Sequence, residues 1–273
     1  MNELIIKEIS QAYNFHFGGK INRLSVAVQL GLPVPNGFAL DMNLIKDIIL
    51  EPDDNRLHRI NEITALIINR FSLNESSYLI VRTSSLLEDS MSDSKAGASF
   101  SQRCQSNIAE LANTINIVIE SNLSNYLFDF GLLIQKVPDV LVSGVAFSGY
   151  PDSDTNVIEG GFNFGEYVVS GKQIDFRFSL PRKVSQISND CYNHKIPIRK
   201  YQSQDDLKLI IANRVNLLTD IVARNMNFSP DIEWVVDKSG IIYLVQIRPI
   251  TTLNNILSKE KFFRHYIEIY FAG

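Results

Sequence analysis

Two apolar segments separated by a short polar turn place the strongest constraint on the fold of this chain. The segments 231–236 (DIEWVV) and 241–249 (IIYLVQIRP) flank the turn-forming run Asp237-Lys238-Ser239-Gly240. Such a pattern predicts an antiparallel hairpin. If Val236 faces Ile241 across the turn, the register of the whole hairpin follows, and with it the face on which each side chain lies.

One face of this hairpin is expected to gather polar side chains. In the assumed register Asp231 lies opposite Gln246, and Glu233 lies opposite Leu244. Alternation then places Asp231, Glu233, Gln246 and Arg248 on one face, and Ile232, Trp234, Val236, Val245 and Ile247 on a core face. Oxygen donors beside a guanidinium suit Mg²⁺ on a polyphosphate. The alternative is an exposed polar face with a surface ion pair, and a one-residue bulge would break the pairing argument.

The composition excludes several classes of protein. The chain has 26 Lys and Arg against 30 Asp and Glu, a formal net charge of −4, so we expect neither a nucleic-acid partner nor a membrane partner. Hydrophobic residues make up 45% and charged residues 21%, as in a globular protein with its own core. Cys104 and Cys191 are expected to be free thiols. No signal peptide or membrane span is evident, so we expect a cytoplasmic protein.

Periodicity along the chain predicts a mixed α/β (α+β) fold with two lobes. Residues 1–102 are expected to form an N-terminal α/β lobe that ends in a mobile, serine-rich loop at 83–102. Residues 103–252 contain several short apolar runs and are expected to form a strand-rich lobe. Residues 253–273 are expected to form a C-terminal helix that begins a further domain.

Three segments could contact phosphate. Gly18-Gly19-Lys20 opens a predicted helix, so backbone N–H groups and an ammonium would point at one place. A Gly-Gly turn before any helix would look the same, and the segment lacks the P-loop spacing. Arg82 ends a predicted strand and could clamp phosphate or pair with an acidic neighbour. The segment 96–101 (AGASFS) is small enough to close over an anion, or it is a linker.

Other candidate sites receive no support from the sequence. The run from Gly160 to Glu166 (GGFNFGE) fails the spacing of a dinucleotide-binding loop. Four histidines are scattered without metal-ligand spacing, so surface positions are expected for them. They are His16, His58, His194 and His265.

Several motifs occur in an order that identifies a family. They are GGK with GLPVPNGFAL (18–40), VRTSSLLED (81–89), AGASFS (96–101), IQKV with SGVAFS (134–148), FGEYVVSG (164–171) and DIEW with VQIRPIT (231–251). Together they resemble the nucleotide-binding domain of the pyruvate phosphate dikinase and phosphoenolpyruvate synthase family, and also the ATP domains of rifampin phosphotransferase and L-glutamine kinase. The resemblance implies an ATP-grasp fold whose two lobes clasp ATP with Mg²⁺.

The resemblance also implies roles for individual residues. Lys20 and Arg82 would hold the phosphates and, with Arg248, take part in catalysis. Gly97 and Ser101 would belong to the covering loop, Gln135 would lie beside the nucleotide, and Glu166 matches the last residue of the family's GLGE motif. Glu233 and Gln246 would bind the metal with Asp231 beside them. Asn163 and Ala98 depart from the family's pattern.

The implied function is that of a phosphoryl-donor module. It would pass phosphate from Mg-ATP to a histidine on a separate domain or partner, and from there to a small-molecule acceptor. The family's phosphohistidine motif is absent from this sequence, so we expect the chain to be incomplete as an enzyme. The alternative is a nucleotide-binding regulatory module without turnover.

Overall fold

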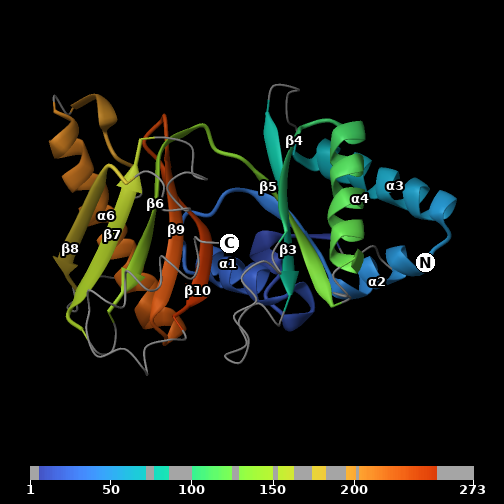
Figure 1. Cartoon of the computed structure of the whole chain (residues 1–273), viewed down its shortest axis with the longest axis horizontal. Coiled ribbons are helices and arrows are strands. Elements are labelled where there is room, and N and C mark those ends of the chain that lie inside the picture. Colours follow the sequence, from blue (N-terminus) through green and yellow to red (C-terminus); the bar gives the residue numbers. More distant parts are fainter. Residues whose placement is uncertain are drawn as a thin grey trace. The chain divides into compact units, whose positions relative to one another are not determined.

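The chain divides into two units, which we describe separately. The computed structural model describes residues 6–71, 77–85, 100–124, 129–149, 153–162, 174–182, 195–200 and 203–250. The first unit comprises residues 1–26 and 35–137, and the second comprises residues 27–34 and 138–273. Each unit contains one five-stranded antiparallel sheet with helices packed on it (Figure 1). The structure therefore has the predicted α+β class.

The first unit has its strands in the order β1-β2-β5-β3-β4. These strands are β1 (Ile6–Glu8), β2 (Gly37–Leu40), β3 (Tyr78–Ser85), β4 (Ser101–Gln105) and β5 (Phe130–Lys136). The helices are α2 (Met42–Leu50), α3 (Asp53–Phe71), α4 (Ile108–Ser124) and most of α1 (Gly19–Gln29), whose last three residues belong to the second unit. Short 3-10 turns lie at Ile9–Gln11 and Phe15–Phe17. Asp41 is the N-cap of α2, because its Oδ1 accepts a hydrogen bond of 2.7 Å from the backbone N–H of Leu44.

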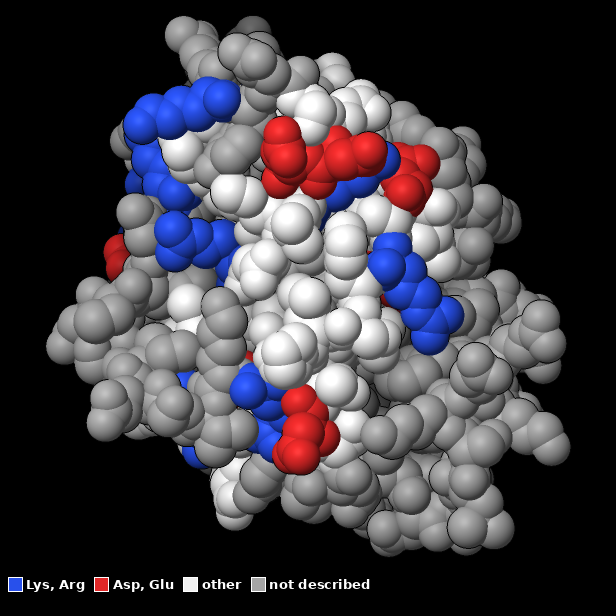
Figure 2. All heavy atoms as spheres, turned by 90° about the vertical axis from the view of Figure 1, so that its left-hand side faces the viewer, with Lys and Arg blue, Asp and Glu red and all other residues white. Residues whose placement is uncertain are grey.

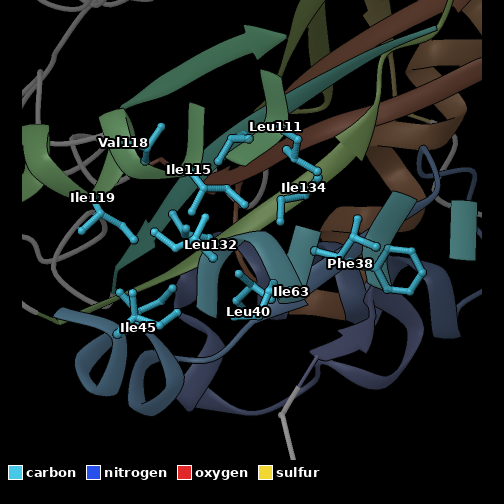
Figure 3. Close-up of a cluster of buried hydrophobic side chains, with 14 of the residues drawn as sticks. Phe38, Leu40, Ile45, Ile63, Leu111, Ile115, Val118, Ile119, Leu132 and Ile134 are labelled. Atoms are coloured by element: carbon cyan, nitrogen blue, oxygen red, sulfur yellow. The ribbon is translucent and has the colours of Figure 1, made fainter. Parts of the chain in front are cut away.

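The core of the first unit lies between one face of its sheet and three helices (Figure 3). Phe38, Leu40, Leu132 and Ile134 contribute from β2 and β5, while α2, α3 and α4 contribute from the other side. The helical residues labelled in Figure 3 are Ile45, Ile63, Leu111, Ile115, Val118 and Ile119. Arg82 and Gln135 alternate with core residues along β3 and β5, so they lie on the opposite face of the sheet.

The second unit has its strands in the order β10-β9-β6-β7-β8. They are β6 (Val140–Ser148), β7 (Thr155–Gly161), β8 (Phe176–Pro181), β9 (Pro230–Asp237) and β10 (Ile242–Pro249), with the helix α6 (Gln204–Met226) and a 3-10 turn at Ile198–Lys200. A buried polar network attaches α6 to one face of the sheet. Asn156 on β7 donates hydrogen bonds of 2.9 Å to Asn216 and to Asp220 on the helix.

Trp234 sets the packing on this helix-covered face. Its indole is fully buried and lies in one cross-strand row with Gly144, Gly160 and Phe176. A Cβ atom on Gly144 would come within 2.4 Å of the indole, and one on Gly160 within 2.9 Å. The two glycines therefore provide the space that the indole fills.

The structure moves the predicted boundary between the lobes. We expected it after residue 102, but that position lies inside β4, and β5 pairs with both β2 and β3. The first unit thus extends to residue 137. Of the expected loop at 83–102, residues 83–85 instead belong to β3 and residues 101–102 to β4. Residues 86–99 and the expected helix at 253–273 lie outside the described residues.

The surface agrees with the charge composition. Figure 2 shows one face of the molecule, where basic and acidic side chains are interspersed around an uncharged centre. In the described part of the chain, no helix is both long and apolar enough to cross a lipid bilayer. Cys104 is a buried free thiol, as expected, and Cys191 lies outside the described residues.

We predict that Gly18→Ala destabilises the first unit. Gly18 has a φ of +84°, and a Cβ atom there would lie 2.1 Å from the carbonyl oxygen of Ser84 on β3. The backbone strain alone costs about 1–3 kcal/mol, and the clash adds to it. Gly31→Ala is the matched control, since Gly31 has a φ of +74° but no atom within 4 Å of the added Cβ. Urea unfolding should show the larger loss for Gly18→Ala, and equal losses would contradict the close packing.

Candidate nucleotide and metal site

The hairpin forms, but in a different register from the predicted one. Asp237 accepts hydrogen bonds of 2.9 Å from the backbone N–H groups of Ser239 and Ile241, and Gly240 has a φ of +88°. The loop is therefore three residues long, a common hairpin connection with a left-handed glycine. Val236 pairs with Ile242 rather than Ile241. The predicted pairing was wrong by one residue at the turn.

A bulge in β10 then shifts the register by one further residue. It lies between Leu244 and Gln246, so that Gln246 pairs with Glu233 and Arg248 pairs with Asp231. The expected partners, Gln246 for Asp231 and Leu244 for Glu233, are thus corrected. Val245 was expected on the core face, but it is the bulged residue and is only half-buried. The two shifts add up to two residues, which restores the side-chain parity.

All four polar side chains therefore lie on one face of the hairpin, as predicted. Nη2 of Arg248 donates a hydrogen bond of 2.7 Å to Oε1 of Glu233, and its Nε lies 3.4 Å from Oδ2 of Asp231. Asp231, Glu233 and Gln246 are buried, whereas the Arg248 side chain is 28% exposed. This face is opposite the one that α6 covers, because Asp231 and Glu233 alternate with Trp234 along β9. A single guanidinium thus joins two buried carboxylates.

These residues fit a divalent cation of the Mg²⁺ type. Asp231 and Glu233 both contact the guanidinium of Arg248, so the same two carboxylates can converge on a metal ion. The amide oxygen of Gln246, which pairs with Glu233 across the hairpin, is a third oxygen donor. Mg²⁺ takes one or two carboxylates and completes its shell with water and phosphate oxygens. Among the described residues, no group of three or more His, Cys, Asp or Glu side chains could hold a metal. A site here would therefore be completed by water or by phosphate oxygens.

The first unit brings the GGK segment and strand β3 together. Nζ of Lys20 is buried and donates a hydrogen bond of 3.0 Å to the carbonyl oxygen of Thr83, next to Arg82. Oγ of Ser84 accepts a hydrogen bond of 3.1 Å from the backbone N–H of Ile21. The helix N-terminus was expected to present its N–H groups to phosphate. The N–H of Ile21 instead donates to Ser84 on β3. This contact fixes the start of α1 against β3, where the Lys20 ammonium lies beside the residue that precedes Ser84.

Three other predicted residues of the first unit share a face of its sheet. Arg82 on β3 pairs with Ser101 on β4 and with Leu133 on β5. Gln135 lies two residues from Leu133 and has the same parity, so it projects on the same side as Arg82 and Ser101. Nε2 of Gln135 donates a hydrogen bond of 3.1 Å to the carbonyl oxygen of Pro35. Gly97 and Glu166, also predicted to contact nucleotide, lie outside the described residues.

One buried carboxylate in the second unit was not singled out from the sequence. Glu159 on β7 is 2% exposed and pairs with Val145, which in turn pairs with Glu233. It therefore lies in the same cross-strand row as Glu233 and on the same face. Its partner is Arg177 on β8, whose Nε lies 3.2 Å from Oε1 of Glu159. A lone charge inside the apolar run NVIEGG was the signal that could have indicated it.

We predict that Glu159 makes the stability of the second unit fall as pH rises. Burial raises the pKa of the Glu159 carboxyl, and the charge of Arg177 opposes this only in part. The protonated carboxyl of Glu159 therefore contributes its full stabilisation below the ordinary pKa of about 4.3. That stabilisation is lost as the pH rises through the raised pKa of the folded state. Glu159→Gln should need more urea to unfold than the parent at about pH 8, with the advantage vanishing near about pH 4.

Arg177→Gln is the control with the opposite sign. Removing the opposing positive charge should raise the pKa of Glu159 further and steepen the loss of stability with pH. A stability advantage of Glu159→Gln that does not change with pH would contradict this account.

Comparisons with known proteins place the chain in a family of nucleotide-binding domains. Residues 52–265 match the model of the pyruvate phosphate dikinase AMP/ATP-binding domain. The chain is 23% identical over 302 residues to a probable phosphoenolpyruvate synthase of Methanothermobacter thermautotrophicus, covering 86% of this chain and 44% of that protein. It is 25% identical over 282 residues to the uncharacterized phosphotransferase YvkC of Bacillus subtilis, covering 87% of this chain and 34% of that protein. The chain thus spans less than half the length of these relatives.

Among solved structures, the chain aligns with the D-cycloserine synthetase DcsG at a TM-score of 0.42 and 11% identity, covering 91% of this chain and 68% of that one. This alignment adds nothing to the family assignment. The matched residues include both Arg82 and the whole β9–β10 hairpin, while Lys20 lies before them. On the extent of this match, the chain belongs to the family of AMP/ATP-binding domains of pyruvate phosphate dikinase.

Proposed function

We propose that this chain is the phosphoryl-donor module of a phosphoenolpyruvate-synthase-like phosphotransferase. It would bind Mg-ATP and pass a phosphoryl group to a histidine on a separate domain or subunit, which would then deliver it to a small-molecule acceptor. The observation that carries the proposal is the group of Asp231, Glu233, Gln246 and Arg248, which places oxygen ligands for a cation beside a guanidinium for phosphate. The family assignment and the names of both relatives support it.

Phosphoryl transfer requires positioning and neutralisation of charge more than covalent chemistry. A bound Mg²⁺ would neutralise charge on the phosphate oxygens, held by Glu233 and Gln246 with Asp231 beside them. Lys20, Arg82 and Arg248 would hold the phosphates, and each would stabilise negative charge that develops on the transferred group. Gln135 would lie beside the nucleotide, and Gly97, Ser101 and Glu166 would complete its surroundings.

The proposed acceptor is a histidine that this chain does not supply. Among the described histidines, His16 is exposed, and His58 pairs with Glu62 at 3.3 Å on the surface of α3. Neither belongs to the family's phosphohistidine motif, which the sequence lacks. A partner that carries the histidine would therefore be needed for net transfer, and that partner would also determine the final acceptor.

We predict that Mg-ATP or Mg-ADP raises the melting temperature of the chain. A ligand that binds only the folded state stabilises it by ~2.7 kcal/mol at a hundredfold excess over its Kd. In Arg82→Gln and Lys20→Met, this nucleotide-dependent shift should be much smaller. Methionine suits position 20 because it retains the apolar stem of a buried side chain, although the lost hydrogen bond to Thr83 should cost about 1 kcal/mol of basal stability.

Arg103→Gln is the matched control for these variants. Arg103 is an exposed arginine of β4 whose guanidinium lies 3.9 Å from the ring centroid of Tyr78, so its loss should leave the nucleotide shift unchanged. A flat thermal-shift curve of the parent chain at millimolar nucleotide would contradict the proposed function. A parent-like shift in Arg82→Gln would remove Arg82 from the phosphate site.

We predict that the chain alone does not become stoichiometrically phosphorylated. With ATP labelled at the β- and γ-phosphates and Mg²⁺, acid-labile and base-stable label should stay near background until a phosphohistidine domain of this family is added. The reason is that the sequence lacks the phosphohistidine motif of this family, so we expect no acceptor histidine of this chain in line with the transferred phosphate. Stoichiometric label on His16, His58, His194 or His265 would contradict the donor-only role. No label even with added histidine domain would favour the regulatory alternative.

A further inference from the structure

Arg248 makes contacts that a phosphate-binding residue does not need. Its guanidinium contacts Glu233 at 2.7 Å and Asp231 at 3.4 Å, and these are the two carboxylates proposed to bind the cation. The Asp231 side chain is 2% exposed and that of Glu233 is 11% exposed. The two carboxylates carry a formal charge of −2, and the guanidinium cancels half of it.

The same oxygens cannot serve the guanidinium and a divalent cation at once. Buried carboxylates without a counter-charge are strongly destabilising. Asp231 and Glu233 therefore need a positive partner in both states, which is Arg248 without metal and the cation when metal is bound. A divalent cation would reverse the local charge and repel Arg248 from the carboxylates. The displaced guanidinium stays close to the cation, because β10 pairs with β9, which carries Asp231 and Glu233. A guanidinium in that position can make bidentate contacts to a phosphate group.

We propose that Arg248 competes with the divalent cation for Asp231 and Glu233, so that Arg248 acts as an internal substitute for the metal. Metal binding displaces the guanidinium and makes it available to the polyphosphate. A polyphosphate that binds Arg248 in turn opens the metal site, so the two ligands reinforce each other's binding. This inference rests on the proposed function and adds to it a reason for cation and nucleotide to bind together.

The second unit offers a matched control for this pair. Arg177 also pairs with a buried carboxylate, that of Glu159, on the same face of the same sheet. Its side chain is 47% exposed, and Glu159 lies two strands away from Glu233 in the cross-strand row. Arg177→Gln therefore removes one positive charge from the same face without uncovering Asp231 or Glu233.

The experiment measures binding of Mn²⁺ alone to the whole chain, by electron paramagnetic resonance of the unbound ion. The parent should bind Mn²⁺ weakly, because the cation must break the contacts of Arg248. Arg248→Gln should bind Mn²⁺ at least about tenfold more tightly. In the parent, metal binding breaks the charged contacts of Arg248 with Glu233 and Asp231, and in the variant there are no such contacts to break. Arg177→Gln should bind Mn²⁺ within about twofold of the parent, which is the change that a lost distant charge allows.

Melting temperatures with and without Mn²⁺ provide a second measurement, which tests Arg248→Gln even if the substitution lowers its stability. Arg248→Gln should have a lower melting temperature than the parent without metal, and saturating Mn²⁺ should raise the melting temperature of the variant more than that of the parent. If Arg248→Gln does not fold, Arg248→Lys retains the charge but not the fork that reaches both carboxylates. That variant should still bind Mn²⁺ more tightly than the parent.

The outcomes separate this inference from the proposed function. Equal or weaker Mn²⁺ binding by the Arg248 variants would overturn the competition, even if the parent chain binds Mg-ATP as proposed. Equal tightening by Arg177→Gln would also overturn it, because a general charge effect would then explain the gain. Absence of any Mg-ATP binding by the parent would instead overturn the proposed function, as measured separately by the thermal shift.

Discussion

The packing of the Trp234 indole against two glycines is the contact on which the second unit depends. Gly144 and Gly160 lie in register with Trp234 on adjacent strands, and the indole occupies the space that two Cβ atoms would take. A slip of one residue in β9 would place the indole on the other face and turn Asp231 and Glu233 toward α6. The packing on the helix-covered face therefore determines where Asp231 and Glu233 project, although neither of them takes part in it.

The hairpin shows what alternation predicts and what it does not. The shared face of Asp231, Glu233, Gln246 and Arg248 was predicted correctly, but the pairing that led to it was wrong. A three-residue loop and a bulge at Val245 each shift the register by one residue, and only their sum preserves the parity. The loop could have been anticipated from Asp237 and the glycine three residues later. The bulge could not, because it depends on packing against neighbouring strands rather than on local sequence.

The first unit illustrates a different limit of the sequence. Asp41 as a helix cap and the short strand that precedes it are local features, which short-range sequence patterns can indicate. The contact of Lys20 with Thr83 joins residues 63 apart, and no local pattern indicates it. The same holds for β5, whose apolar run fits either lobe by composition. Only its pairing with β2 and β3 assigns it to the first sheet, and this long-range pairing is what placed the boundary at residue 137.

Two of the cations proposed to bind phosphate already have partners within the chain. The ammonium of Lys20 binds the carbonyl oxygen of Thr83, and the guanidinium of Arg248 binds Glu233 and Asp231. A polyphosphate bound as proposed would therefore exchange one set of contacts for another, and the net gain in binding free energy would be the difference between them. The carbonyl of Thr83 is uncharged, so losing the contact with Lys20 costs little free energy compared with uncovering a charge. Asp231 and Glu233 are buried and charged, so they need another positive group when Arg248 leaves. A polyphosphate would therefore draw Lys20 away from Thr83 without help, whereas it would draw Arg248 away from the carboxylates most readily together with a cation that replaces the guanidinium.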